Sequence, residues 1–230
     1  MILLIDTATA RCSVALSEGA QILQYREAEG RNVHAAMVAP LIKEVLEAQG
    51  VKASDLAAVC VSKGPGSYTG LRVGVSTAKG ICFGAGVPLL AVGTLDALVA
   101  QAFAEGLVPE GCTHIVPMID ARRMEVYCAV YDAKGRAQTE VAPQVIDSDS
   151  FADLFAEGGK VLFIGDGAEK CREALGGQPG AVFAPCCPKA SSLAIPAAAA
   201  LSDSRFENVA YFEPFYLKDF IATVSRKNLF

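Results

Sequence analysis

The chain has 230 residues, of which 52% are hydrophobic and 20% are charged, and its formal net charge is −5. This composition excludes an intrinsically disordered chain and predicts a substantial core, in one large domain or two compact lobes. The acidic balance also disfavours a protein that grips nucleic-acid phosphates by itself, so we expect any RNA contact to be shared with a partner unless the surface carries a local basic patch.

Cysteine usage and the first residues predict a cytoplasmic protein. None of the eight cysteines forms a Cys-x-x-Cys motif and most lie in apolar runs, which favours buried, reduced thiols over disulfides. We interpret the adjacent Cys186 and Cys187 as part of a surface loop. A zinc site is disfavoured because neither of the two histidines lies near a cysteine pair. The apolar run 2–5 lacks the basic stretch and cleavage site of a signal peptide, and no apolar run has membrane-spanning length.

The first fifty residues predict an antiparallel meander and a helix. Short apolar runs separated by tight turns predict three strands, one ending at Asp6 and Thr7 and two over residues 12–16 and 21–28. Residues 33–49 have helical periodicity, and their apolar arc is wider than the stripe of about 100° that a surface helix needs. We therefore expect this helix to contact a partner as well as the core. Pro40 predicts a kink or a later helix start.

Strands and helices alternate in the next segment. A strand over residues 56–62 leads into a glycine-rich turn and a helix to about Phe83. A strand over 87–92 then precedes a helix for which Thr94 is the expected N-cap.

The pattern then restarts, which predicts an internal duplication. Strands are expected over 115–120, 125–131 and 161–164, and an alanine-rich helix capped by Ser191 over 192–204. Positions 6 and 120 are 114 residues apart, and at that offset similar pairs coincide: Ile5-Asp6 with Ile119-Asp120, Ala15-Leu16 with Ala129-Val130, and Glu18 with Asp132. We expect an α/β, actin-like fold with two lobes, residues 1–104 and 105–230, each a mixed sheet flanked by helices, with the last helix packing back on the first lobe.

The glycine-rich segment after the second buried strand is the first candidate site. Gly64, Gly66 and Ser67 stand between a strand and a helix, where free backbone N–H groups suit an anion. The segment matches neither the P-loop nor Gly-x-Gly-x-x-Gly, so a tight structural turn is an equal alternative. In the helix that follows, Gly70, Gly74 and Ala78 share one face, which fits burial in its own domain or close packing against a partner's helix.

Aspartates end the first strand of each predicted lobe. Asp6 and Asp120, together with Thr7, are candidates for a nucleotide cleft, and turn-forming or capping carboxylates are the alternative. Neither His34 nor His114 has an acidic or cysteine residue directly beside it in sequence, and no Ser-His-Asp or Cys-His arrangement is evident.

Several blocks, in order along the chain, resemble the TsaB (YeaZ) family of tRNA threonylcarbamoyladenosine biosynthesis proteins. The most specific block is Gly64-Pro65-Gly66-Ser67-Tyr68-Thr69-Gly70-Leu71-Arg72, and the weakest region is 140–210. The other blocks are 5–9 with 12–16, 93–95, 119–123 with 125–127, and 213–217.

The resemblance implies a function. It implies a non-catalytic, degenerate paralogue of the TsaD enzymes, once labelled glycoproteases, that works with a TsaD-like enzyme and a TsaE-like ATPase to move a threonylcarbamoyl group from its adenylate to an adenosine beside the tRNA anticodon. TsaD-type proteins carry a His-x-x-x-His metal pair where this chain has Thr94 and Leu98, which cannot replace imidazole ligands. No cofactor of its own is expected, ATP and a metal ion belonging to the partners, and tRNA contact is expected only through the complex.

The resemblance also implies a homodimer when the chain is alone, through the surface that binds the TsaD-like partner. We predict that this surface consists of residues from the two N-lobe helices: Met37, Val38, Leu41, Val45, Leu71, Gly74, Val75 and Ala78.

Two other functions remain open at this point. A small actin-like ATPase or kinase would use Asp6 and Asp120 around a nucleotide, although a clear adenosine motif is missing. A peptidase is the second alternative, but no nucleophile or metal set supports it.

Overall fold

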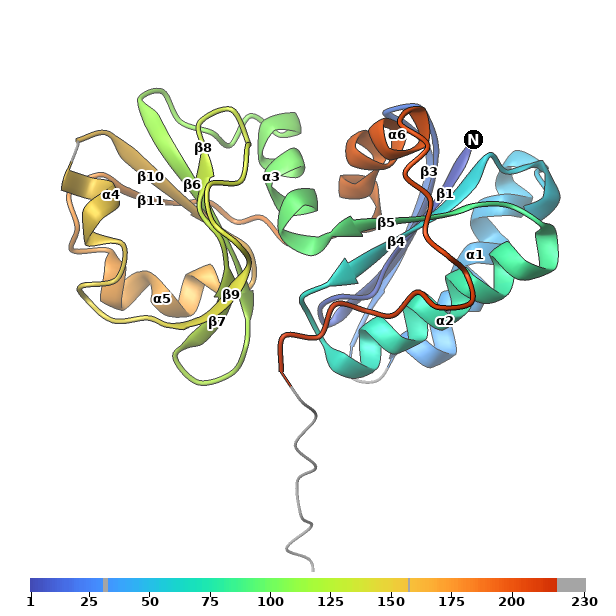
Figure 1. Cartoon of the computed structure of the whole chain (residues 1–230), viewed down its shortest axis with the longest axis horizontal. Helices are drawn as coiled ribbons and strands as arrows, with labels where there is room; N and C mark the ends of the chain where they lie inside the picture. Colours follow the sequence, from blue (N-terminus) through green and yellow to red (C-terminus); the bar gives the residue numbers. More distant parts are fainter. Residues whose placement is uncertain (31–32, 157, 219–230) are drawn as a thin grey trace, which may run out of the picture.

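The computed structural model describes residues 1–30, 33–156 and 158–218, which form two lobes side by side (Figure 1). Each lobe is built on one mixed sheet. In the first sheet the strand order is β3-β2-β1-β4-β5. Its strands are β1 (Ile2–Asp6), β2 (Arg11–Glu18), β3 (Gln21–Glu29), β4 (Ala58–Gly64) and β5 (Leu89–Gly93). The first three strands are antiparallel, which confirms the predicted meander, and β4 and β5 run parallel to β1.

The second sheet repeats this arrangement. Its order is β11-β10-β6-β7-β9, with the short β8 pairing beside β7 on β6. Its strands are β6 (Cys112–Asp120), β7 (Glu125–Cys128), β8 (Tyr131–Asp132), β9 (Ala142–Val145), β10 (Lys160–Ile164) and β11 (Ala181–Phe183). Strand β6 has two antiparallel strands on one side and two parallel strands on the other, as β1 has. The predicted duplication is therefore confirmed at the level of topology.

The central strands are apolar on both faces because both faces are covered. Every residue of β1 is buried, and its alternate side chains enter different cores. Leu3 and Ile5 pack under helices α1 and α2, whereas Ile2 and Leu4 pack on the opposite face. Continuous apolar strands of this kind are typical of parallel sheets sandwiched between helices.

Helices α1 (Val33–Gln49) and α2 (Tyr68–Ala85) cover one face of the first sheet. The bounds of α1 match the predicted range, and Pro40 lies inside the helix, so the later start is wrong. Helix α2 begins after Ser67, whose hydroxyl accepts a hydrogen bond from the Gly70 amide, and ends at the left-handed Gly86. In the second lobe, α4 (Ala152–Ala156) and α5 (Ala168–Leu175) pack around Phe163.

The two remaining helices are exchanged between the lobes. Helix α3 (Thr94–Ala104) follows the first sheet in sequence but packs on the second, where Leu95 and Leu98 join the core. Helix α6 (Ala194–Ser202), preceded by the 3-10 turn Ala190–Leu193, follows the second sheet but packs on the first. Figure 1 shows α3 and α6 beside each other between the lobes. A lobe boundary after Ala104 stays a prediction.

Three local expectations are wrong. The strand expected over 125–131 breaks after Cys128, because the Val130 amide and carbonyl bond to Thr139 and Gln138 rather than to a neighbouring strand. Thr94 is the first residue of α3 rather than its cap, and its hydroxyl is buried. Ser191 lies in the 3-10 turn, three residues before α6 begins at Ala194. The residue at the N-cap position of that helix is Leu193 rather than Ser191.

After α6 the chain crosses the whole first lobe as an extended segment, here called the strap (residues 203–218). The Glu207 amide donates to the Leu89 carbonyl at the edge strand β5. The Lys79 ammonium donates to the carbonyls of Ala210 and Phe212, at 3.2 and 2.9 Å, which fixes the strap along α2. Figure 1 shows the strap passing from α6 across the lobe to the space between the lobes.

All eight cysteines lie in the described residues, and none forms a disulfide. Cys187 is exposed, Cys112 is intermediate and the other six are buried, so the expectation of a surface loop holds for Cys187 and is wrong for Cys186. Burial raises the pKa of Cys12 and of Cys82 to about 11, which keeps these thiols protonated and unreactive at neutral pH. None of the helices in the described part of the chain has the length and apolar character needed to cross a membrane.

Candidate functional site

The candidate site is the cleft between the glycine-rich segment of the first lobe and the β6–β7 hairpin of the second. A small hollow of about 40 Å³ marks the place where the two lobes and the strap meet. Its lining comes from three parts of the chain far apart in sequence: Pro65, Gly66, Tyr68; Tyr127; and Phe215, Tyr216, Leu217, Lys218. Five of the six predicted cleft residues lie at the ends of β1 and β4 or in the turn after β4, and Asp120 ends β6.

Asp6 is sealed inside the first lobe. Its side chain is completely buried; Oδ1 accepts a long hydrogen bond of 3.4 Å from the Ala8 amide, and Oδ2 has no partner among the described residues. Burial raises the pKa of Asp6 to about 6, against the opposing effects of Ser62, the Ala8 amide and His34. The Ser62 hydroxyl lies close enough to lower this pKa, but within the described ranges it makes no hydrogen bond of regular geometry.

The glycine-rich segment is what seals Asp6. The Ser67 amide donates a 2.7 Å hydrogen bond to the Ala8 carbonyl, so the turn lies directly on the loop after β1. A Cβ atom on Gly66 would strike Ala8, and one on Gly70 or Gly74 would strike Thr7, each closer than real Cβ contacts come. These glycines are needed for close packing within the lobe, so the interpretation as a tight structural turn accounts for them without a phosphate.

Asp120 is exposed but held by a lysine. The Lys170 ammonium, from α5, bonds to Oδ1 of Asp120 and to the Glu125 carbonyl. Asp166 supports the same turn, since its Oδ1 accepts a 3.1 Å hydrogen bond from the Asp120 amide. The Lys170 ammonium thus binds the Asp120 carboxylate, which in an actin-like ATPase would have to hold a metal-bound water.

The strap closes the cleft from below. The Phe215 amide donates a 2.7 Å hydrogen bond to the Lys63 carbonyl on β4, and the Tyr216 ring packs on Tyr68 with 4.7 Å between centroids. Lys218 then reaches the other lobe and forms an ion pair with Glu125. The strap therefore joins the two lobes across the cleft.

His34 has a partner that its sequence neighbours did not indicate. Its Nε2 lies 2.8 Å from the Thr9 carbonyl, and the ring is largely buried. Because a carbonyl only accepts hydrogen bonds, this nitrogen carries the proton. The histidine thereby ties the start of α1 to the β1–β2 turn.

The predicted partner-interface residues lie on the inward sides of α1 and α2. Met37 is partly exposed; the other seven are buried within the lobe: Val38, Leu41, Val45, Leu71, Gly74, Val75 and Ala78. The apolar arc that was assigned to a partner is thus used by the lobe's own core, and the partner interface stays a prediction. The outward side of α2 carries Arg72, Ser76, Gly80 and Phe83, and Phe83 is 87% exposed.

Sequence reasoning did not identify Asp166, Lys170 or the strap residues as parts of the site. The Gly165-Asp166-Gly167 turn at the end of β10 is the one local signal that pointed to this end of the sheet. The contacts of Lys170 and Lys218 join residues 50 and 93 positions apart, which no local pattern encodes.

Comparison with known proteins places the chain in one family. The TsaD family model, described as tRNA N6-adenosine threonylcarbamoyltransferase, matches residues 28–225. The TsaB protein of Escherichia coli K12 is 30% identical over 227 residues, which covers 96% of each chain. The TsaB protein of Bacillus subtilis 168 is 33% identical over 168 residues, covering 71% of this chain and 70% of that protein.

Solved structures agree with this assignment. YeaZ from Pseudomonas aeruginosa superposes with a TM-score of 0.79 at 27% identity, covering 94% of this chain and 99% of that chain. Component A of the (R)-2-hydroxyglutaryl-CoA dehydratase of Acidaminococcus fermentans gives a TM-score of 0.52 at 13% identity, over 89% of this chain and 98% of that chain, and so bears on the fold alone. The predicted two-lobed, actin-like fold is confirmed.

Proposed function

The chain belongs to the TsaB (YeaZ) family, and from this premise we propose that it is a non-catalytic subunit of the machinery that builds threonylcarbamoyladenosine on tRNA in the cytoplasm. Its relatives are named as tRNA threonylcarbamoyladenosine biosynthesis proteins. In this proposal a TsaD-like enzyme transfers the threonylcarbamoyl group and a TsaE-like ATPase assists. The chain scaffolds that enzyme and binds no cofactor of its own, and ATP and a metal ion act on the partner subunits.

The observation that carries a non-catalytic role is that both lobe aspartates are engaged internally. Asp6 is buried below the Gly66–Gly70 turn, and Asp120 is bound by Lys170. Neither carboxylate is placed to hold a metal-bound water beside a nucleotide, as an ATPase or kinase of this fold requires.

The positions at which TsaD-type proteins carry their histidine pair support the same proposal. Thr94 and Leu98 are fully buried at the start of α3, and Leu98 packs in the core of the second lobe. A threonine hydroxyl and an isobutyl group supply no imidazole nitrogen, so this position is built for packing rather than for metal binding.

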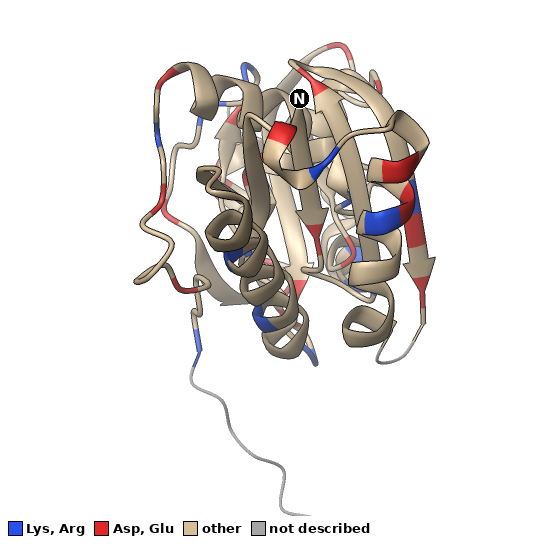
Figure 2. Cartoon of the chain, turned by 90° about the vertical axis from the view of Figure 1, so that its right-hand side faces the viewer, with Lys and Arg blue, Asp and Glu red and all other residues tan. Residues whose placement is uncertain are grey.

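The partner surface is expected on the outward sides of α1 and α2. Helix α2 carries only two charged residues, Arg72 and Lys79, and Figure 2 shows it as a largely uncharged helix on the face of the first lobe. An exposed phenylalanine, Phe83, lies near its end, beside the small residues Gly80 and Gly84. Such a helix suits close packing against another helix, in a homodimer or against the TsaD-like partner.

The decisive experiment is reconstitution. An unmodified tRNA is incubated with threonylcarbamoyl-adenylate, ATP and TsaD-like and TsaE-like proteins, with and without this chain. Its nucleosides are then analysed by mass spectrometry. We expect threonylcarbamoyladenosine only when the chain is present. Equal yield without it would overturn the proposal, and magnesium-dependent ATP hydrolysis by the isolated chain would then support the ATPase alternative.

A further inference from the structure

We propose that the mouth of the interlobe cleft binds RNA directly, by stacking unpaired bases on tyrosine rings and by pairing phosphates with arginine and lysine side chains. This inference rests on the proposed function, which makes tRNA the substrate, and it replaces the expectation that the chain contacts tRNA only through the complex. The surface, here called the cleft-mouth cluster, consists of Tyr68, Arg72, Arg122, Tyr127, Tyr216 and Lys218.

Three segments bring these aromatic rings together. Tyr68 begins α2, Tyr127 lies on β7 and Tyr216 lies on the strap, and all three line the same hollow. Each ring is partly exposed, and Tyr216 rests on Tyr68 at a 34° tilt. Because the hollow measures only about 40 Å³, it cannot enclose a base, and bases must stack on the rim instead. Stacking on exposed aromatic rings is how proteins hold single-stranded RNA with little sequence preference.

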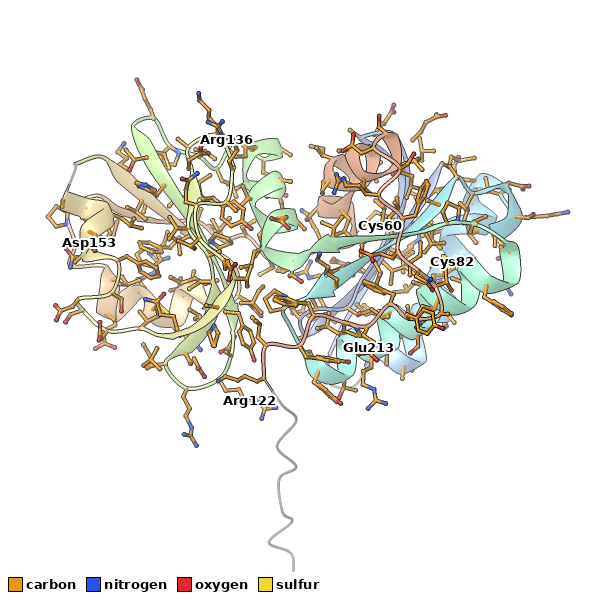
Figure 3. The ribbon with its side chains drawn as sticks, viewed as in Figure 1. Cys60, Cys82, Arg122, Arg136, Asp153 and Glu213 are labelled. Atoms are coloured by element: carbon orange, nitrogen blue, oxygen red, sulfur yellow. The ribbon has the colours of Figure 1, made fainter. Side chains whose placement is uncertain are left out.

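Cations surround the same rings. The Arg72 guanidinium lies 5.6 Å from the centre of the Tyr68 ring. Arg122 and Lys218 lie near enough to the Tyr127 phenol to oppose the rise in its pKa that burial causes. Figure 3 shows Arg122 beside the foot of the strap, on the side of the second lobe opposite Arg136.

The charge balance at the mouth differs from that of the whole chain. Within the described residues, Arg72, Arg122 and Arg123 form no ion pair, so their charges are not neutralised. Four carboxylates lie in the same region, against the five cations Arg72, Arg122, Arg123, Lys170 and Lys218. Glu125 is paired with Lys218, Asp120 is bound by Lys170, Asp166 accepts a hydrogen bond from the Asp120 amide, and Glu213 is close enough to Tyr216 to affect its pKa. Cations therefore outnumber carboxylates here although the chain as a whole has a net charge of −5.

The backbone of the β6–β7 turn gives an independent indication. Arg122 and Arg123 have φ angles of 72° and 52°, in the left-handed region that glycine and asparagine adopt most readily. Two consecutive arginines in this conformation are strained, and strain of this kind is typical of functional sites. Both arginine side chains are exposed, so this turn presents their charges to solvent at the end of the hairpin.

The test measures RNA binding by the full-length chain. Fluorescence anisotropy is recorded with an unmodified tRNA transcript and with a short single-stranded RNA, at about 50 and 200 mM salt. The variant Arg122→Gly with Arg123→Gly removes both charges and relieves the backbone, so it is expected to fold. The matched control is Arg136→Gly, an exposed arginine in the turn at the other end of the same lobe.

We expect the wild-type chain to bind both RNAs, and the double glycine variant to bind about tenfold more weakly with a smaller salt dependence. Arg122→Lys with Arg123→Lys should restore most of the affinity, and Tyr216→Ala should weaken binding about fivefold or more. The control should bind like the wild type.

Two results would overturn the inference: no RNA binding by the wild-type chain, or equal binding by the double glycine variant and the control. Equal, arginine-dependent binding of an acidic peptide would assign the surface to a protein partner and would also overturn it. In each case threonylcarbamoyladenosine formation in the reconstituted reaction is scored separately, so that loss of this inference is distinguished from failure of the proposed function.

Discussion

Asp6 and Ser62 are neighbours on the parallel strands β1 and β4 and are completely buried. Each has a side-chain oxygen that makes no regular hydrogen bond to any residue that the structure describes. Burying an ionised carboxylate with so little compensation is unfavourable, which is why the pKa of Asp6 rises to about 6. This cost gives a direct prediction about stability.

The folded state binds the Asp6 proton more tightly than the unfolded state, in which the pKa is 3.8. The stability that Asp6 contributes is therefore fully present below about pH 4 and is lost as the pH rises to about 6. Asp6→Asn, which cannot ionise, should raise the free energy of unfolding at pH 7.5 by up to about 3 kcal/mol. Urea denaturation from pH 4 to 8 checks this.

The quantity to compare is the difference between the variant and the wild type at each pH, since other carboxylates titrate in the same range. Asp153→Asn, at an exposed position on α4, is the matched control for the loss of a carboxylate. A difference for Asp6→Asn that does not change with pH would contradict the raised pKa of Asp6.

Four glycines on one helix should respond in opposite ways to alanine. At Gly70 and Gly74 a methyl group would strike Thr7, so Gly→Ala should destabilise the protein by about 2 kcal/mol or more. At Gly80 and Gly84 no atom of the described part of the chain lies within 4 Å of an added Cβ, and Gly→Ala should stabilise the protein by about 0.5–1 kcal/mol. Thermal denaturation of the four variants checks both signs.

This contrast also changes how the partner surface should be tested. Gly74→Arg would break the partner contact if Gly74 lay in it, but the structure predicts that it breaks the lobe first. Loss of partner binding in that variant would then report misfolding rather than a lost contact.

Phe83→Asp is the better test of the partner surface. The side chain is 87% exposed, so the change should leave the melting temperature nearly unchanged and abolish co-purification with a TsaD-like partner. Tyr211→Asp, at an 84% exposed aromatic residue on the strap, is the control and should keep the partner. Retention of the partner by Phe83→Asp would place the interface elsewhere.

The strap should open more often when the hydrogen bonds from Lys79 are removed. Lys79→Met keeps most of the aliphatic side chain but loses the hydrogen bonds to the Ala210 and Phe212 carbonyls. Amide hydrogen exchange in residues 207–216 should accelerate by about tenfold, as expected for losing charged hydrogen bonds of about 1.5 kcal/mol. Lys43→Met on α1, whose ammonium is exposed, should leave exchange in the strap unchanged.

Most of the fold could be predicted from sequence because its signals are local or periodic. The bounds of α1 follow from its apolar period, and the repeat at an offset of 114 residues anticipated two sheets of the same topology. Strand breaks and helix caps were harder to predict from sequence. Whether Val130 bonds to a strand or to Thr139 depends on how the turn that directly follows it, up to residue 139, folds back on the chain.

The candidate site was predictable only in part, for a physical reason. Asp6, the glycine-rich turn and Asp120 stand out as residue types at strand ends, but their sequence does not say whether a nucleotide or the protein itself satisfies them. Here Thr7 and Ala8 pack directly against the glycines, and the Lys170 ammonium binds the Asp120 carboxylate. For the interface, helical periodicity located an apolar arc but not which core or partner it faces.

The exchange of α3 and α6 has a consequence for how the chain is made. Strand β5 ends at Gly93, but the helix that covers the other face of its sheet begins only at Ala194. During synthesis, Ile2, Leu4 and Leu90 therefore stay uncovered until most of the second lobe has left the ribosome. Neither half-chain carries all the parts of a closed core. Nascent chains should thus recruit chaperones until α6 emerges, and fragments that end before Ala194 should aggregate rather than fold.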